Sequence, residues 1–332
     1  MHQQDSLQQE IVAAIKKTLN FENFYQRIRP DISPFIAASS QLPLKKIDEW
    51  ERLIRSALYL SCAPNSKLKS HLIGSLGWLD LCNGDGHKRE RALRTLPGKA
   101  PNSFLLALAF RRLNDWVHQV RNAACETLLP IVESTDPDTV VDVLFITLPY
   151  WESWGRMGAT EKKVIMKIFT MEKVTNALKR RLIISTSGPV TAIFTQTGRT
   201  DALDAFLPEI ATNSVQPSLR AKAFRCQFES KFVWAEGMKW QWTDKIYGKQ
   251  RLVPALNQRM ICTTTPFIDT LKMATLDRSP MVRRIAGEML IKELDHVGEE
   301  EAFTLANLLA SDSSQSVAER GKYALAELKK QK

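Results

Sequence analysis

A phrase that occurs more than once constrains the fold of this chain more than any other feature. In its full form, an Asp is followed five residues later by Val, six residues later by Arg and nine residues later by Ala. The two clearest copies begin at Asp115 and Asp277. A weaker copy begins at Ser214, and another begins at Asp312, with Ala in place of the Arg and Gly321 at the small position. A phrase that recurs within one chain predicts a structural unit that recurs.

Each copy is typical of the start of a helix. The side-chain oxygen of its Asp or Ser can accept hydrogen bonds from the free amides of a first turn. Pro217 and Pro280 stand where a first turn tolerates a missing N–H, and the small residue would let a neighbouring helix approach closely. Apolar helical segments precede the copies, at 104–113, 202–210, 267–276 and 303–309. The recurring unit is therefore helix, turn, helix.

Helical spacing also dominates the rest of the chain. Leu7, Ile11, Ile15 and Leu19 recur every four residues, which predicts an amphipathic helix. Further helices are expected at 50–58, 67–81, 89–96, 140–148, 161–169, 174–184 and 190–195. Before residue 100 this spacing is the only support for a repeat unit, because we find no copy of the phrase there. Glycine (14) and proline (15) are too sparse among 332 residues for a turn-rich all-β fold.

The phrases resemble those of the HEAT-repeat family, whose units carry an Asp in the turn between two helices and Val-Arg early in the second helix. The resemblance implies an all-α fold, a right-handed superhelical solenoid of antiparallel helix pairs. On this basis, residues 1–43 would form an N-terminal helical region and residues 44–332 the solenoid. In that family the Asp and Arg form ladders between units. The resemblance thus implies scaffold roles for Asp115, Arg121, Arg220, Asp277 and Arg283.

The spacing of the phrases predicts one insertion. The interval between Ser214 and Asp277 exceeds a single helix-pair unit by roughly 25 residues. The composition changes over about 229–265, where aromatic and basic residues interleave. The aromatic residues include Phe232, Trp234, Trp240, Trp242 and Tyr247, and the basic ones Lys231, Lys239, Lys245, Lys249 and Arg251.

Part of this insertion is expected to form a short hairpin over 232–242. Glu236-Gly237 would supply its turn, and Trp240 and Trp242 would share one face. Aromatic and basic side chains on an exposed loop can anchor a protein partner, and they also suit base stacking with phosphate contacts. Alternatively, they pack the insertion against its own helices. The candidate partner-binding residues are Trp234, Lys239, Trp240, Trp242, Lys245 and Tyr247, with Trp151 and Trp154 from a second cluster.

That second cluster places Glu152 between Trp151 and Trp154. The arrangement is similar to the sites of HEAT-like alkylpurine DNA glycosylases, which use aromatic residues and a carboxylate in a basic groove. Asp115 beside Trp116 offers the same combination. Neither place matches a family motif that can be aligned. Gly-rich phosphate loops, His-Glu-x-x-His and Gly-x-Ser-x-Gly are absent from the sequence, so we assign no catalytic residue.

The formal net charge of +10 predicts a partner with an acidic surface. The positive charge is spread over residues 1–276. A nucleic-acid binder would carry a basic stripe on one face, and the run Lys179-Arg180-Arg181 is the candidate for such contacts.

The cysteines and the apolar segments constrain location and cofactors. Five cysteines lie far apart without any Cys-x-x-Cys pair, which predicts a reducing, cytoplasmic location and no metal site. No segment is long and apolar enough to suggest a membrane span, and the start lacks the pattern of a secretory signal. We expect no cofactor and no membrane partner.

These observations predict a non-enzymatic α-solenoid that binds another macromolecule through its concave face and the aromatic insertion. A protein–protein adaptor, or an inhibitor of the kind found among bacterial immunity proteins, is the leading hypothesis. The alternative is a nucleic-acid-binding HEAT-like protein, with alkylpurine-type glycosylase activity as one version.

Overall fold

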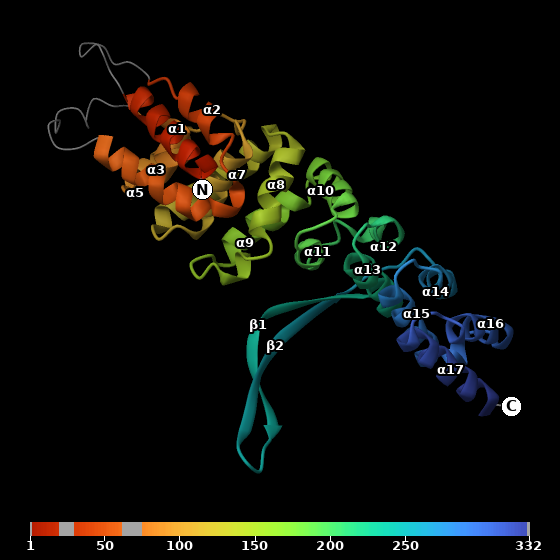
Figure 1. The fold of residues 1–332 in the computed structure, drawn as a ribbon. Coiled ribbons are helices and arrows are strands. Elements are labelled where there is room, and N and C mark those ends of the chain that lie inside the picture. Colours follow the sequence, from red (N-terminus) through yellow and green to blue (C-terminus); the bar gives the residue numbers. More distant parts are fainter. Residues whose placement is uncertain (1, 20–29, 62–74, 331–332) are drawn as a thin grey trace, which may run out of the picture. The chain divides into compact units, whose positions relative to one another are not determined.

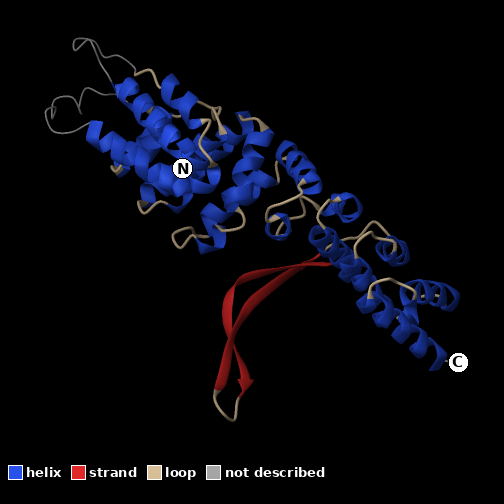
Figure 2. Cartoon of the chain, in the orientation of Figure 1, coloured by secondary structure: helices blue, strands red, loops and turns tan. Residues whose placement is uncertain are grey.

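The computed structural model describes residues 2–19, 30–61 and 75–330 (Figure 1). This part of the chain is predominantly helical, with one two-stranded antiparallel sheet (Figure 2). The predicted helical class is therefore confirmed. The chain forms two compact units, residues 1–174 and 175–332. No helix in the described ranges is long and apolar enough to cross a membrane.

The core of the first unit surrounds a short helix, α6 (Ser103–Arg111), whose central residues are all apolar. Every residue from Phe104 to Phe110 is buried, and α6 packs against α3, α7 and α8. Among the described residues of this unit, the other helices are α1 (His2–Leu19), α2 (Ser33–Ser39), α3 (Ile47–Ser61), α5 (Gly86–Thr95), α7 (His118–Ser134), α8 (Pro137–Thr147) and α9 (Ala159–Phe169). Short 3₁₀ helices are η1 (Leu44–Lys46), η2 (Gly77–Cys82), η3 (Arg112–Asn114) and η4 (Trp151–Ser153).

The second unit contains the hairpin and helices of which three consecutive pairs pack together, α12 with α13, α14 with α15 and α16 with α17. Helix α10 (Glu172–Ile184) crosses the boundary between the units. The following helices are α11 (Val190–Thr197), α12 (Leu207–Asn213), α13 (Pro217–Glu229), α14 (Phe267–Thr275), α15 (Pro280–Lys292), α16 (Glu299–Ala310) and α17 (Gln315–Lys330), with η5 (Asp204–Phe206) and η6 (Leu294–His296). The strands are β1 (Lys231–Asp244) and β2 (Lys249–Met260).

Two of the expected helices need correction. The helix expected over 202–210 begins only at Leu207, after the 3₁₀ turn η5. Pro208 is the reason, because proline is tolerated in the first turn of a helix and not inside it. Of the helix expected over 67–81, residues 67–74 lie outside the described part of the chain, and the end of that segment is 3₁₀ helix η2.

An arginine–aspartate contact recurs with the phrase. In each case Nε and Nη2 of the arginine donate to the two carboxylate oxygens of the aspartate. The pairs are Arg89–Asp115, Arg220–Asp277 and Arg283–Asp312. The remaining nitrogen, Nη1, donates to a carbonyl six residues earlier, and these carbonyls belong to Asn83, Ser214 and Asp277. Each arginine therefore joins the turn before its own helix to the turn of the following phrase.

The contact made by Arg89 reveals a further copy of the phrase before residue 100, where none was expected. Asn83 is followed six residues later by Arg89 and nine residues later by Ala92. The arginine binds the backbone carbonyl of the first residue, so that residue need not be Asp. Asn83 also accepts the N–H of Asp85 on its side-chain oxygen, as Asp115 accepts the N–H of Val117. Asn therefore replaces Asp without loss of the turn.

Gly321, the small residue of the last phrase, allows the close approach of a neighbouring helix that the sequence predicts. A Cβ at Gly321 in α17 would lie 2.1 Å from the backbone nitrogen of Ala310 at the end of α16, so the two helices touch through their backbones. Gly321→Ala is expected to lower the free energy of unfolding by about 1–3 kcal/mol through overpacking. The matched control is Gly298→Ala, where an added Cβ meets nothing within 4 Å. Urea unfolding followed by circular dichroism checks this, and equal midpoints for both variants would contradict it.

The insertion forms a longer hairpin than expected, with its turn elsewhere. The chain turns between Asp244 and Lys249, where the Asp244 carboxylate accepts the N–H groups of Ile246 and Tyr247. The predicted turn at Glu236-Gly237 is wrong, because these residues form a bulge within β1. Gly237 has a φ of +84°, which a β-bulge accommodates as readily as a turn does.

Candidate functional site

The base of the hairpin is anchored to the helices of the second unit. Phe232 in β1 is fully buried, with its ring centroid 5.0 Å from that of Phe194 in α11. A Cβ at Gly198 would lie 1.9 Å from the Phe232 ring, so the ring rests directly on the backbone there. Arg259, which faces Phe232 across the sheet, donates to the Gly198 carbonyl and pairs with Asp204. This anchoring fixes where the hairpin leaves the helices.

The bulge reverses the side of the hairpin on which the even-numbered β1 residues lie. Before it, Phe232 and Trp234 face the helices and are buried. Ala235 pairs with Leu256 and Met238 pairs with Pro254, so β1 has two residues between these pairs where β2 has one. This extra residue shifts the alternation of side chains along β1 by one position relative to β2. Beyond the bulge, Trp240 and the even-numbered residues beside it therefore lie on the opposite side.

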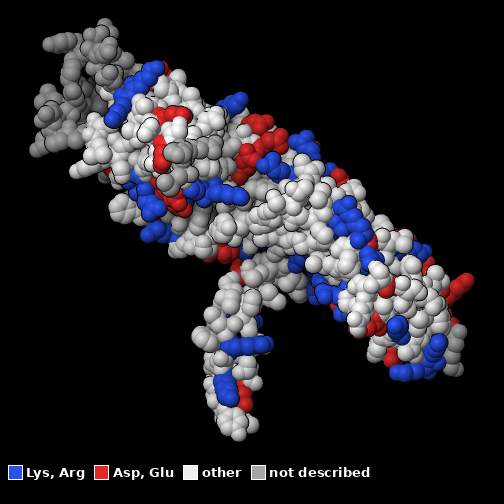
Figure 3. Space-filling view, viewed as in Figure 1, with Lys and Arg blue, Asp and Glu red and all other residues white. Residues whose placement is uncertain are grey.

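Beyond the bulge, the hairpin has two chemically different faces. We call one the apolar face, formed by Met238, Trp240, Trp242, Leu252, Pro254 and Leu256, with the polar Gln250 opposite Trp242. The other is the basic face, formed by Lys239, Gln241, Lys249, Arg251 and Val253. In Figure 3 the hairpin surface is largely white with blue basic patches. Trp240 is 67% exposed and Trp242 50% exposed, so the expectation that they share one face is confirmed, and that face is open.

The tip of the hairpin also carries exposed apolar and basic side chains. Tyr247 and Ile246 are strongly exposed, and the Lys249 ammonium lies 5.7 Å from the centroid of the Tyr247 ring. Lys245 is exposed beside them. The candidate residues Lys239, Lys245 and Tyr247 thus all reach solvent on the hairpin.

A groove of about 420 Å³ lies at the root of the apolar face. Its lining cations are Lys222 and Arg225 of α13 and Lys231 of β1, against one lining carboxylate, that of Glu229; Arg225 also pairs with Glu288 of α15 at 3.1 Å. Leu256 lines the groove and also belongs to the apolar face. The two surfaces are therefore continuous, and the groove carries an excess of positive charge.

Three of the candidate tryptophans do not lie on the open faces of the hairpin. Trp151 in η4 is fully buried in the core of the first unit. Trp234 is 8% exposed, with the Arg199 guanidinium 5.8 Å from its ring centroid. Trp154 is half-buried and lines a pocket of the first unit. Only Trp240 and Trp242 therefore offer open indole surface on the insertion.

Glu152 and Asp115, the carboxylates considered for glycosylase chemistry, make contacts within the fold. Glu152 pairs with Lys162 at 2.9 Å. Asp115 is buried, and its oxygens accept hydrogen bonds from Arg89, Arg112 and the N–H of Val117. Neither carboxylate is placed as an open general base.

Of the basic run on α10, Lys179 contacts neighbouring side chains. Its ammonium pairs with Glu209 at 2.8 Å and lies 4.6 Å from the centroid of the Phe206 ring. Arg180 and Arg181 are exposed on the helix. The run therefore does not act as a block of three solvated cations.

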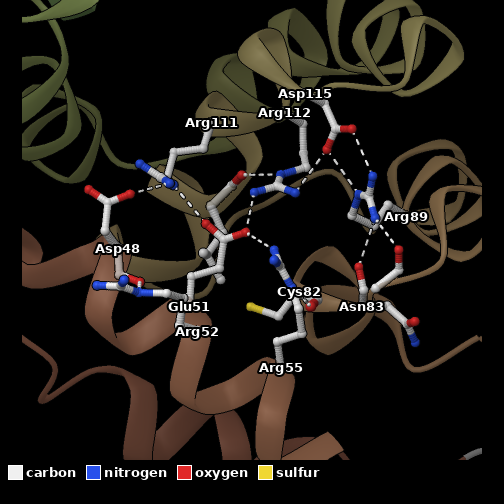
Figure 4. A network of polar contacts seen from close by, with 12 residues as sticks. Asp48, Glu51, Arg52, Arg55, Cys82, Asn83, Arg89, Arg111, Arg112 and Asp115 are labelled. Atoms are coloured by element: carbon white, nitrogen blue, oxygen red, sulfur yellow. Dashed lines mark hydrogen bonds and ion pairs between the residues drawn. The ribbon is translucent and has the colours of Figure 1, made fainter. Parts of the chain in front are cut away.

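Sequence reasoning missed a polar pocket of about 370 Å³ in the first unit. In its lining, the Glu51 carboxylate accepts hydrogen bonds from Arg55, Arg111 and Arg112 (Figure 4). Burial raises the pKa of Glu51, but the guanidinium charges outweigh it and lower the pKa to about 2. We call this the arginine–tryptophan pocket; it is lined by Glu51, Arg55, Arg111, Arg112, Asn114, Asp115, Trp116, Trp154 and Arg156.

The cysteines of the described residues are free thiols. The four that lie in the described ranges are unpaired, and Cys82 and Cys226 are buried. Burial raises the pKa of the Cys226 thiol to about 11, so it stays protonated and weakly nucleophilic. No three His, Cys, Asp or Glu side chains within the described residues are grouped to hold a metal ion.

The comparisons with known proteins leave the family open. No protein-family model matches the chain, and no curated protein matches it either.

Proposed function

We propose that this protein is a non-enzymatic binding module, a HEAT-like α-solenoid that docks an acidic protein partner through its hairpin. The observation that carries the proposal is the uncovered apolar face of the hairpin. Large apolar side chains gathered on an exposed surface mark interaction sites in soluble proteins. A two-stranded hairpin is also only marginally stable in water by itself, so a partner that covers this face would stabilise it. An adaptor or an inhibitor would use such an arm.

The composition of the apolar face favours a protein over a nucleic acid. Trp240 and Trp242 could stack on bases, but they lie among Met238, Leu252 and Leu256. Aliphatic side chains gain from burial against other apolar side chains, and nucleic acid offers little such surface. Tryptophan with methionine is typical of the buried centre of a protein interface.

The surrounding charge favours an acidic partner. The basic face carries Lys239, Lys249 and Arg251, and the groove at the root adds an excess of cations. Charges around an apolar centre steer association and select partners of opposite sign. The solenoid assignment is supported by the recurring arginine–aspartate contact, because a repeated unit must satisfy the same polar groups each time it is stacked.

Replacing both exposed tryptophans tests the proposal. Partners are captured from source cells with the full chain and identified, and their affinity is then measured with purified proteins. Trp240→Ala with Trp242→Ala is expected to weaken binding at least 30-fold, the factor that corresponds to roughly 2 kcal/mol lost at a single hot-spot residue. The melting temperature should stay within a few degrees because both indoles are exposed.

The matched control is Tyr323→Ala, which removes an exposed aromatic ring from α17 of the same unit and should leave the affinity unchanged. Undiminished binding by the double variant, or a collapse of its thermal stability, would refute the docking role of the hairpin. Salt-sensitive binding of DNA or RNA with no protein partner would instead favour the nucleic-acid alternative.

A further inference from the structure

The arginine–tryptophan pocket has the size and position of a small-molecule site. Its volume of about 370 Å³ falls within the range of ligand pockets, about 300–1,000 Å³. Helix α3 contributes Glu51 and Arg55, the end of α6 and η3 contribute Arg111 and Arg112, and Arg156 follows η4. The pocket lies within the first unit, whereas the hairpin belongs to the second.

The pocket carries an excess of two positive charges. Four arginines line it, against the carboxylates of Glu51 and Asp115. The outer partners Asp48 and Arg89 cancel each other. Because the guanidinium charges keep Glu51 ionised, this balance holds at neutral pH. A ligand that neutralises the pocket therefore carries about two negative charges, as a phosphate monoester does at pH 7.

Two arginines have donors to offer such a group. Arg55 donates from Nε to the Cys82 carbonyl and from Nη2 to Glu51, which leaves Nη1 for a ligand. The exposed Arg156 guanidinium makes no hydrogen bond or ion pair with any described residue, although its backbone N–H is held by Asn114 at 2.9 Å. The planar Arg156 guanidinium can therefore bind two phosphate oxygens at once, and Arg55 can add a donor from Nη1.

Two tryptophans supply an apolar wall beside these cations. Trp116 is 69% exposed although it lines the pocket, and Trp154 is half-buried there. The Arg89 guanidinium lies 5.8 Å from the Trp116 ring centroid, a cation–π contact that favours this position of the indole. Open indole surface next to a phosphate-sized cluster of donors suits a flat ring that carries a phosphate, since stacking on an aromatic side chain contributes about 1–3 kcal/mol per base.

We propose that this pocket binds a nucleoside 5′-monophosphate, with the phosphate on Arg55 and Arg156 and the base against Trp116 and Trp154. The site binds and does not convert its ligand, because the oxygens of Glu51 and Asp115 are engaged by arginines. This second site is independent of partner docking by the hairpin.

Calorimetric titration of the full chain at low salt tests the site. The ligands are AMP, GMP, CMP and UMP, with adenosine and inorganic phosphate as half-ligands. At least one mononucleotide should bind with a Kd below 1 mM, and each half-ligand at least tenfold more weakly. A 5′-phosphorylated oligonucleotide and its unphosphorylated form distinguish a strand end from a free nucleotide. If the oligonucleotide binds equally well with and without its phosphate while mononucleotides do not bind, the proposal is overturned.

Variants locate the binding. Arg156→Gln and Trp116→Ala should each weaken the bound mononucleotide at least tenfold without unfolding the chain, since both side chains are exposed. Arg91→Gln, at an exposed arginine of α5 outside the pocket, should have no effect. Trp240→Ala with Trp242→Ala should also leave nucleotide affinity unchanged. Failure of every mononucleotide to bind below 1 mM, or binding that Arg156→Gln and Trp116→Ala leave intact, overturns the proposal.

Discussion

Asp277→Ala is expected to lower the free energy of unfolding of the second unit by about 3–5 kcal/mol, the cost of breaking a buried ion pair on one side. Arg220 is 1% exposed, and its Nε and Nη2 lie 2.8 and 2.9 Å from the Asp277 oxygens. Its Nη1 is held by the carbonyls of Ser214 and Val215. The guanidinium therefore cannot swing into solvent when its partner is removed, and a buried charge is left unpaired.

Urea unfolding followed by far-UV circular dichroism measures this loss. Asp269→Ala, at an exposed carboxylate of α14, is the control and should change stability by no more than about 0.5 kcal/mol. A double variant, Arg220→Met with Asp277→Leu, removes both charges and should recover much of the loss, because apolar replacement of a whole buried pair is often neutral. A cost below about 1 kcal/mol for Asp277→Ala would mean that the contact does not hold the two turns together.

The helices that follow the phrases could be predicted from sequence because their signals are local. Capping oxygens, first-turn prolines and apolar spacing all act within about ten residues. Helices α13 and α15 begin at Pro217 and Pro280, where the sequence indicated. The phrase at Asn83 was missed because Asn replaced Asp, and its signal was the six-residue offset to Arg89.

The hairpin shows what local signals cannot decide. Both Gly237 and Gly248 have positive φ, and either could mark a turn. The choice depends on pairing along two complete strands, which places the turn beyond Asp244 and turns Gly237 into a bulge. The bulge in turn decides which tryptophans are exposed, so the same residue type is buried at Trp234 and open at Trp240.

The arginine–tryptophan pocket was beyond sequence reasoning for a different reason. Its central carboxylate, Glu51, lies on α3, and its partners Arg111 and Arg112 come from a segment about 60 residues later. In the sequence these arginines form only a short basic run, which an exposed helix face explains equally well. Only tertiary packing shows that the run meets a buried acid.

Glu51 makes the free energy of unfolding of the first unit depend on pH. Burial alone would raise its pKa, but Arg112 and Arg111 lower it to about 2, from an ordinary value near 4.5. A carboxyl group with a lowered folded-state pKa stabilises the fold above its unfolded value, and this contribution is lost as pH falls toward the folded value. The difference corresponds to about 3 kcal/mol at neutral pH, which should disappear between about pH 5 and pH 2.

Glu51→Gln should therefore destabilise the first unit by about 3 kcal/mol at pH 7 and by much less near pH 2, where the wild-type carboxyl group is becoming protonated. Glu49→Gln, at an exposed carboxylate of the same helix, is the control and should behave like wild type throughout. Denaturant unfolding at pH 7, 5, 4 and 3 measures the convergence of the two curves. If the difference between wild type and Glu51→Gln stayed constant over this range, the ionised carboxylate would not be what holds the three arginines together.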